Sequence, residues 1–296
     1  MEFKPESLEN SNIYLINLIK NSDNKPFLVS RLGIGQETVT TYNYMACGKV
    51  SERNIYGLSN NNGIYCKSTD DVILFCKSYD DTLRNSNAIA LWEPPLVNDI
   101  LIPQNYFCKK YDKLCHLCVD VLEPPKIMVD TNIVPWTHSL KGKKVLVINP
   151  FAKSFKKQLD NNFVFFNKSK KNIFLDNQEF MFYKTYNTSA GNHIHKNWLE
   201  TYMLMCKDIS NIDFDIALLG CGGYGLPLCN FIKSKLNKSA IYIGGSLQLL
   251  FGVIGKRWEE DDIWKKIFDK EETNFIRPEE SEQIKNKELV EGGCFW

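Results

Sequence analysis

The chain has 296 residues, which corresponds to one large or two modest domains. Its content of 44% hydrophobic and 24% charged residues is typical of globular proteins and excludes a disordered, collagen-like or coiled-coil chain. With 36 basic and 35 acidic residues the net charge is +1, so no global field favours nucleic acid or anionic lipid as a partner. The first residues do not resemble a signal peptide, and no apolar run approaches the roughly 20 residues of a transmembrane helix. We therefore expect a cytoplasmic protein whose ten cysteines are reduced.

Residues 1–140 are predicted to form a mixed α/β half of the chain. Short apolar runs that end at glycine or proline indicate strands, and longer segments with one apolar face indicate helices. On these grounds we expect strands over residues 27–31 and 88–92, and helices over residues 8–20, 37–47, 70–83 and 110–122.

Residues 141–258 are predicted to form a Rossmann-like half with a parallel sheet. This part of the chain contains continuous apolar runs, which are typical of strands that are buried on both faces. Strands that alternate with helices indicate βαβ units, and ligands of such sheets bind at the carboxyl ends of the strands. We expect strands over residues 144–148, 215–219 and 240–243, and helices over residues 149–159, 194–206 and 225–236.

Residues 259–296 are interpreted as an acidic C-terminal tail. Residues 259–291 carry twelve acidic and six basic side chains, whereas residues 141–172 carry nine lysines and one aspartate. These two segments could face each other. We expect instead that each is a solvated surface, because exposed ion pairs contribute only about 0–1 kcal/mol each.

Glycines after a predicted buried strand form the first candidate site. Gly220, Gly222 and Gly225 have the Gly-x-Gly-x-x-Gly spacing directly before a helix. Such glycines let the backbone approach a phosphate, and the helix start offers N–H groups and a positive dipole end. A dinucleotide site needs an acid about 20 residues further on. Residues 243–246 contain none, which disfavours an NAD-dependent dehydrogenase. The alternative is a tight turn that binds nothing.

A second glycine turn repeats this arrangement after the next predicted strand. Two such turns at one sheet edge could hold a diphosphate, and two nearby cationic side chains, Lys256 and Arg257, could neutralise its charge. The alternative for the two cations is a basic pair that only ends a helix. The candidate nucleotide-binding residues are Gly220, Gly222, Gly223, Tyr224, Gly225, Gly244, Gly245, Ser246, Lys256 and Arg257.

The segment from Arg31 to Glu37 also places glycines after a short strand. Arg31 precedes Gly33 and Gly35, and Glu37 follows them. One interpretation is an ion pair between Arg31 and Glu37 that only supports the fold. The other places both side chains at the mouth of a site, with Arg31, Gly33 and Gly35 as candidate ligand-binding residues and Glu37 as a candidate base.

This segment resembles the N-terminal motif of the GT-D-fold glycosyltransferases, which runs Arg-x-Gly-Asp-Gly-Glu. Residues 222–245 are similar to the glycine turn, apolar helix and strand end of that family. The resemblance implies a nucleotide-sugar donor and a metal-linked pair of acids. Here Ile34 and Gln36 occupy the acidic positions and Glu37 comes one place later. At most one carboxylate is therefore available to Mn²⁺ or Mg²⁺. We name no metal ligand and leave metal dependence open.

Other motifs carry less weight. Residues 244–252 and 290–296 also resemble uncharacterised bacterial and viral proteins, which implies no activity. The Cys115-x-x-Cys118 pair has no partner pair at zinc-finger spacing, so two buried thiols in a helix are expected. His193 is a lesser candidate for a sugar contact.

The sequence thus predicts a glycosyltransferase that moves a sugar from a nucleotide-diphosphate donor to a glycan or other acceptor. The glycine turns would hold the nucleotide, and the arginines and lysine would stabilise the diphosphate leaving group. Glu37, or Glu93 at the end of a predicted strand, would deprotonate the acceptor hydroxyl. Glu93 could equally be an ordinary exposed acid.

Two other functions stay open. One is a non-catalytic nucleotide- or sugar-phosphate-binding protein, and the other is a structural viral or host-interaction protein on a Rossmann-like scaffold. Whether Arg31, Glu37, Glu93 and Gly222 converge on one cleft discriminates among the three.

Overall fold

The computed structural model describes residues 3–23, 25–93 and 95–296. In this part of the chain seven strands form one sheet in the order β3-β2-β1-β7-β6-β4-β5, and every neighbouring pair is parallel. The predicted α/β class with a Rossmann-like parallel sheet is therefore confirmed. The strands are β1 (Leu28–Arg31), β2 (Ala88–Leu91), β3 (Cys115–Cys118), β4 (Val145–Asn149), β5 (Phe180–Lys184), β6 (Ile216–Leu219) and β7 (Ser239–Tyr242).

Strands from both halves of the chain share this sheet. β1 pairs with β7, and Val29 lies opposite Ile241. The central strands are buried on both faces, as their continuous apolar runs predicted. In β4, for example, Val145 and Val147 pack on one side and Leu146 and Ile148 on the other.

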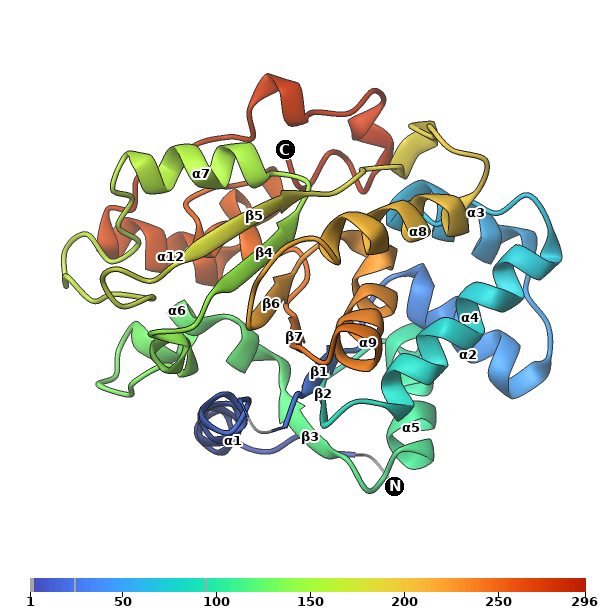
Figure 1. The fold of residues 1–296 in the computed structure, drawn as a ribbon, viewed down its shortest axis with the longest axis horizontal. Coiled ribbons are helices and arrows are strands. Elements are labelled where there is room, and N and C mark those ends of the chain that lie inside the picture. The colour runs from blue at the N-terminus through green and yellow to red at the C-terminus, as the bar shows by residue number, and fades with distance from the viewer. Residues whose placement is uncertain (1–2, 24, 94) are drawn as a thin grey trace.

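Helices cover both faces of the sheet (Figure 1). One face carries α1 (Leu8–Lys20), α6 (Pro124–Met128), α7 (Ala152–Asp160), α10 (Leu247–Leu250), α11 (Lys256–Glu259) and α12 (Asp262–Glu271). The other carries α2 (Gln36–Cys47), α3 (Glu52–Asn62), α4 (Thr69–Arg84), α5 (Asn98–Lys110), α8 (Trp198–Ile209) and α9 (Gly225–Leu236).

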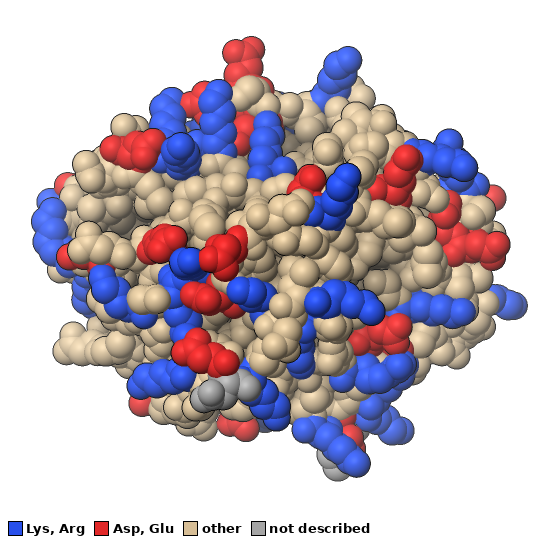
Figure 2. Space-filling model, in the orientation of Figure 1, with Lys and Arg blue, Asp and Glu red and all other residues tan. Residues whose placement is uncertain are grey.

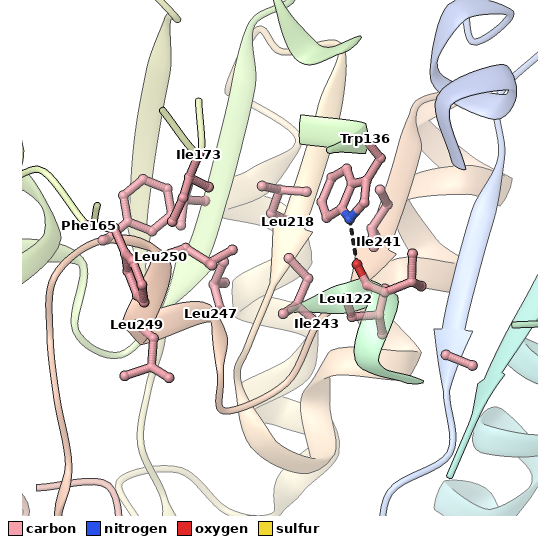
Figure 3. Close-up of a cluster of buried hydrophobic side chains, with 14 of the residues drawn as sticks. Leu122, Trp136, Phe165, Ile173, Leu218, Ile241, Ile243, Leu247, Leu249 and Leu250 are labelled. Atoms are coloured by element: carbon pink, nitrogen blue, oxygen red, sulfur yellow. Dashed lines mark hydrogen bonds between the residues drawn. The ribbon is translucent and has the colours of Figure 1, made fainter. Parts of the chain in front are cut away.

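The core under α10 illustrates the packing of the first face (Figure 3). Trp136 is fully buried beside Leu218 and Ile241, and its indole N–H donates to the Val121 carbonyl at 2.7 Å. The tryptophan therefore contributes a large apolar surface without leaving its one polar atom unpaired, which would cost stability.

The sequence prediction is wrong at one edge of the sheet and misses the strand at the other. Residues 110–122 do not form one helix: Cys115–Cys118 is the edge strand β3, paired with β2, and Val119–Leu122 is a 3₁₀ helix. Cys118 is buried and Cys115 half-buried, and both thiols are free. The opposite edge strand, β5, was not predicted.

The expectation that the lysine-rich and acidic segments are separate solvated surfaces is also wrong. Lys168 Nζ lies 2.8 Å from Glu272 Oε1, and the buried Glu282 carboxylate accepts from the Lys153 N–H at 2.7 Å. The two segments therefore face each other, and residues 259–296 pack against α7 and the sheet. On the face shown in Figure 2, acidic and basic side chains are interspersed.

None of the helices within the described ranges has both the length and the apolar character needed to cross a lipid bilayer.

Candidate functional site

The chain topology opens a crevice at the carboxyl ends of the central strands. After β1 and β6 the chain enters helices on one face of the sheet, α2 and α9. After β7 and β4 it enters helices on the opposite face, α10 and α7. Loops that leave neighbouring strands toward opposite faces diverge, and ligands of open α/β sheets bind in the gap.

A pocket occupies this crevice. Its empty volume is about 1030 Å³, which includes space open to solvent. The loops after β1, β4, β5, β6 and β7 all contribute to its wall, together with the end of α3. Residues 290–296, which we call the C-terminal segment, complete it. In Figure 1 this C-terminal segment crosses the top of the molecule. The pocket is therefore built from both halves of the chain.

The structure brings most of the sequence-predicted residues to this pocket. Those that line it are Arg31, Gly33, Gly35, Glu37, Gly220, Gly222, Tyr224, Gly244, Gly245 and Arg257. Those outside its lining are Glu93, Gly223, Gly225, Ser246 and Lys256. Glu93 is exposed. Lys256 points to Glu260, with Nζ 3.6 Å from Oε1.

Arg31, the last residue of β1, is held in place by neighbouring strands. Its Nη1 donates to the Ile243 carbonyl at 2.7 Å, and its guanidinium lies 5.0 Å from the centre of the Trp92 ring. Any side chain at Gly244 would collide with this guanidinium, and Gly244 has a φ of +84°. Arg31 Nε is buried without a hydrogen-bond partner. The guanidinium is thus fixed but has donor capacity left.

Glu37 stands in the first turn of α2 and is only 7% exposed. Gly33 and Gly35 leave space that the Glu37 carboxylate fills, so these glycines accommodate the acid rather than a phosphate. The ion pairs among the described residues do not include one between Glu37 and Arg31. The two side chains are therefore not the salt bridge that the first interpretation of this segment required.

Burial raises the pKa of Glu37 above its ordinary value of 4.5. The backbone N–H of Glu37, the charge of Arg31 and the nearby amide of Asn62 act in the opposite direction, and the charge of Glu291 adds to the increase in pKa. A carboxylate with a raised pKa is a better proton acceptor than an ordinary one.

The Gly-x-Gly-x-x-Gly turn packs tightly against the protein itself. The space beside Gly225 is filled by the Tyr242 ring and that beside Gly223 by Ile64. Gly222 has a φ of +58°, and a Cβ there would lie 3.0 Å from the Asn62 carbonyl oxygen. These glycines are thus required by the fold, whatever the pocket binds.

The C-terminal segment closes one side of the pocket. Arg257 forms an ion pair with Glu291, and its guanidinium lies 4.7 Å from the centre of the Phe295 ring. Phe295 in turn fills the space beside Gly245, where a Cβ would lie 2.7 Å from the ring. Arg257 therefore faces the pocket with its charge already partly compensated.

Sequence reasoning missed the polar residues from two other elements. Asn62 ends α3, and Thr185 directly follows β5, neither of which was predicted from the sequence. Both carry a buried oxygen without a hydrogen-bond partner, Asn62 Oδ1 and Thr185 Oγ1. Only the position of such residues in space marks them, since asparagine and threonine are common in loops.

The residues present do not form a metal site. Within the described residues, no three His, Cys, Asp or Glu side chains come together as metal ligands. Glu37 and Glu291 are the acids that line the pocket, and Glu291 is already paired with Arg257. His193 stacks on Tyr65, with their ring centres 3.9 Å apart, and does not belong to the pocket lining.

No known protein-family model matches the chain, and no curated protein shows detectable sequence similarity to it.

Proposed function

We propose that this pocket binds a nucleotide-diphosphate sugar and transfers the sugar to an acceptor hydroxyl. The observation that carries the proposal is the presence of a fixed arginine and a buried glutamate with a raised pKa in one pocket. The pocket lies at the carboxyl edge of a parallel sheet, where nucleotide ligands of such folds bind.

Arg31 is assigned to the diphosphate. When the bond between the sugar and the diphosphate breaks, the leaving phosphate oxygen takes the electron pair and its negative charge grows. An arginine that is already positioned stabilises this charge without reorganising during the reaction. The Nε of Arg31, which lacks a partner, is free to donate to a phosphate oxygen.

Glu37 is assigned to the acceptor. The acceptor hydroxyl oxygen forms a bond with the anomeric carbon of the sugar, and its proton passes to the Glu37 carboxylate, which later releases it to water. Glu93, the other base that the sequence suggested, is exposed and outside the pocket lining, so it has no part in this proposal.

Because the lining does not fit a metal ion, no step is assigned to one. A second candidate function is binding without transfer. It is favoured by Ile34 and Gln36, which occupy the acidic positions of the family motif and leave Glu37 and the ion-paired Glu291 as the acids of the pocket lining.

The test has two stages. Calorimetric titration with a panel of UDP and GDP sugars measures binding, and release of the nucleoside diphosphate in the presence of glycan acceptors measures turnover. We expect at least one donor to bind, and we expect Glu37→Gln to lower turnover by about 10²-fold or more while binding persists. Glu93→Gln is the matched control and should leave both unchanged. Binding without turnover would support the second candidate, and absence of binding would contradict both.

A further inference from the structure

The polar side chains on the pocket wall fall into two groups. Those of the first group bond to the protein: Asn149 Nδ2 donates to the Gly220 carbonyl at 2.6 Å, and Thr188 Oγ1 donates to the Gly63 carbonyl at 2.6 Å. The second bond fixes the loop after β5 against the end of α3. The first group therefore shapes the pocket rather than binding a ligand.

The second group consists of oxygens that the protein leaves unpaired. Glu37 Oε2, Asn62 Oδ1 and Thr185 Oγ1 are all buried and have no hydrogen-bond partner. Glu37 is 7% exposed and Thr185 is 4% exposed. Buried polar atoms without a partner are rare in folded proteins because they cost stability, so three in the lining of one pocket indicate partners that a ligand supplies.

The chemistry of these oxygens narrows the ligand. All three accept hydrogen bonds, and the only one with a proton of its own is the Thr185 hydroxyl. A phosphate has acceptor oxygens only, so this part of the wall would repel it. A cation is disfavoured by Arg31, whose charge already acts on Glu37. Neutral O–H groups satisfy acceptors without either penalty.

We propose that Asn62, Thr185 and Glu37 form a subsite for sugar hydroxyls. This deepens the proposed function, on which it rests for the position of the donor: Arg31 lies at the phosphate side of the pocket, and the loop after β5 lies at the sugar side. The sugar belongs either to the donor or to the glycan acceptor, and in both cases its hydroxyls donate to the same oxygens.

The experiment compares two threonines that differ in position only. Thr185→Val removes the unpaired hydroxyl of the subsite. Thr40→Val removes another buried, unpaired hydroxyl, in α2 and outside the pocket lining. Neither hydroxyl has a partner in the protein, so both variants should fold, with melting temperatures at or above that of the wild type. Calorimetry then measures the affinity of each protein for UDP, UDP-glucose, UDP-N-acetylglucosamine, their GDP counterparts and short neutral oligosaccharides.

The inference predicts that a nucleotide sugar binds more tightly than its nucleoside diphosphate. Thr185→Val should weaken binding of the sugar nucleotide by about three- to tenfold, the value of one neutral hydrogen bond, and leave the diphosphate unaffected. Thr40→Val should change neither affinity. If the loss in Thr185→Val falls on the oligosaccharides instead, the sugar that the subsite holds is the acceptor.

Three other results decide the remaining cases. If a diphosphate binds but Thr185→Val has no effect on any sugar ligand, the subsite is refuted and the proposed function stands. If no nucleotide binds but an oligosaccharide does, and Thr185→Val weakens it, the subsite stands and the donor proposal fails. If nothing binds, both are refuted.

Discussion

Replacing Glu37 by glutamine should stabilise the protein at neutral pH while it lowers the rate of transfer. The Glu37 carboxylate is buried, and its Oε2 has no hydrogen-bond partner. An unpaired buried polar group costs about 1–3 kcal/mol, and more when the group is charged. Glutamine keeps the shape and removes the charge, but it also loses the attraction to Arg31. We therefore expect a gain of about 1 kcal/mol, which is about 2 °C in melting temperature for a chain of this size.

The pH dependence of this gain follows from linkage. Folding raises the pKa of Glu37 above 4.5, so the native state binds this proton more tightly than the unfolded chain does. The wild type therefore loses stability as the pH rises from 4.5 through the raised native pKa, and the penalty is constant above it. Glu37→Gln lacks the penalty. Its advantage should be largest near pH 8 and vanish as the pH falls below 4.5.

Glu282→Gln is the matched control. Glu282 is 3% exposed, like Glu37, but its carboxylate accepts from the backbone N–H groups of Lys153 at 2.7 Å and Ser154 at 3.0 Å. Glutamine cannot accept through both ends of its side chain, so this variant should lose about 1–3 kcal/mol. Urea and thermal unfolding of both variants between pH 4 and 8 measure the difference. A Glu37→Gln protein that is less stable than the wild type at pH 8, or whose advantage does not depend on pH, would refute this reasoning.

Three further substitutions probe the walls of the pocket. Arg31→Lys should lower kcat/KM for donor turnover at least tenfold, equal to about 1.4 kcal/mol, because lysine cannot reproduce the fixed guanidinium; unchanged turnover would contradict the assignment. Glu291→Gln should tighten UDP binding by up to about fivefold, because it frees the charge of Arg257; weaker binding would show that the pair itself is needed. Gly244→Ala should disturb Arg31 and weaken UDP binding. Its control is Gly142→Ala, because Gly142 has a φ of +81° with open space around it, so this variant should lower stability without changing binding. Equal effects of the two variants on UDP binding would refute the role of Gly244.

The central strands could be predicted from sequence because their environment leaves a local signal. β4, β6 and β7 are buried along their length, and each contains a continuous run of at least three apolar residues. The edge strands lack this signal. β5 is only partly buried along its length, and β3 lies between a helix and a 3₁₀ helix, so that its four residues continue an apparent helical pattern.

The site was predictable where glycines follow a predicted strand. This led to Arg31 and Glu37, and the structure places both on the pocket wall. What fills the space beside a glycine could not be predicted, because it depends on distant residues: the Tyr242 ring lies beside Gly225, and Phe295 lies beside Gly245. The contribution of residues 290–296 to the pocket wall could not be predicted either, because the return of this segment to the sheet depends on tertiary packing.

The position at which a donor binds tests the proposed function most directly. Hydrogen–deuterium exchange, measured with and without a saturating concentration of the nucleotide sugar that binds most tightly in the calorimetric panel, maps the site on the full chain. If the donor binds in the pocket, exchange should slow at residues 31–37, 185–189, 220–224 and 244–248, which belong to four separate loops of the pocket. Protection confined to other segments, or no binding by any member of the panel, would contradict the proposed function.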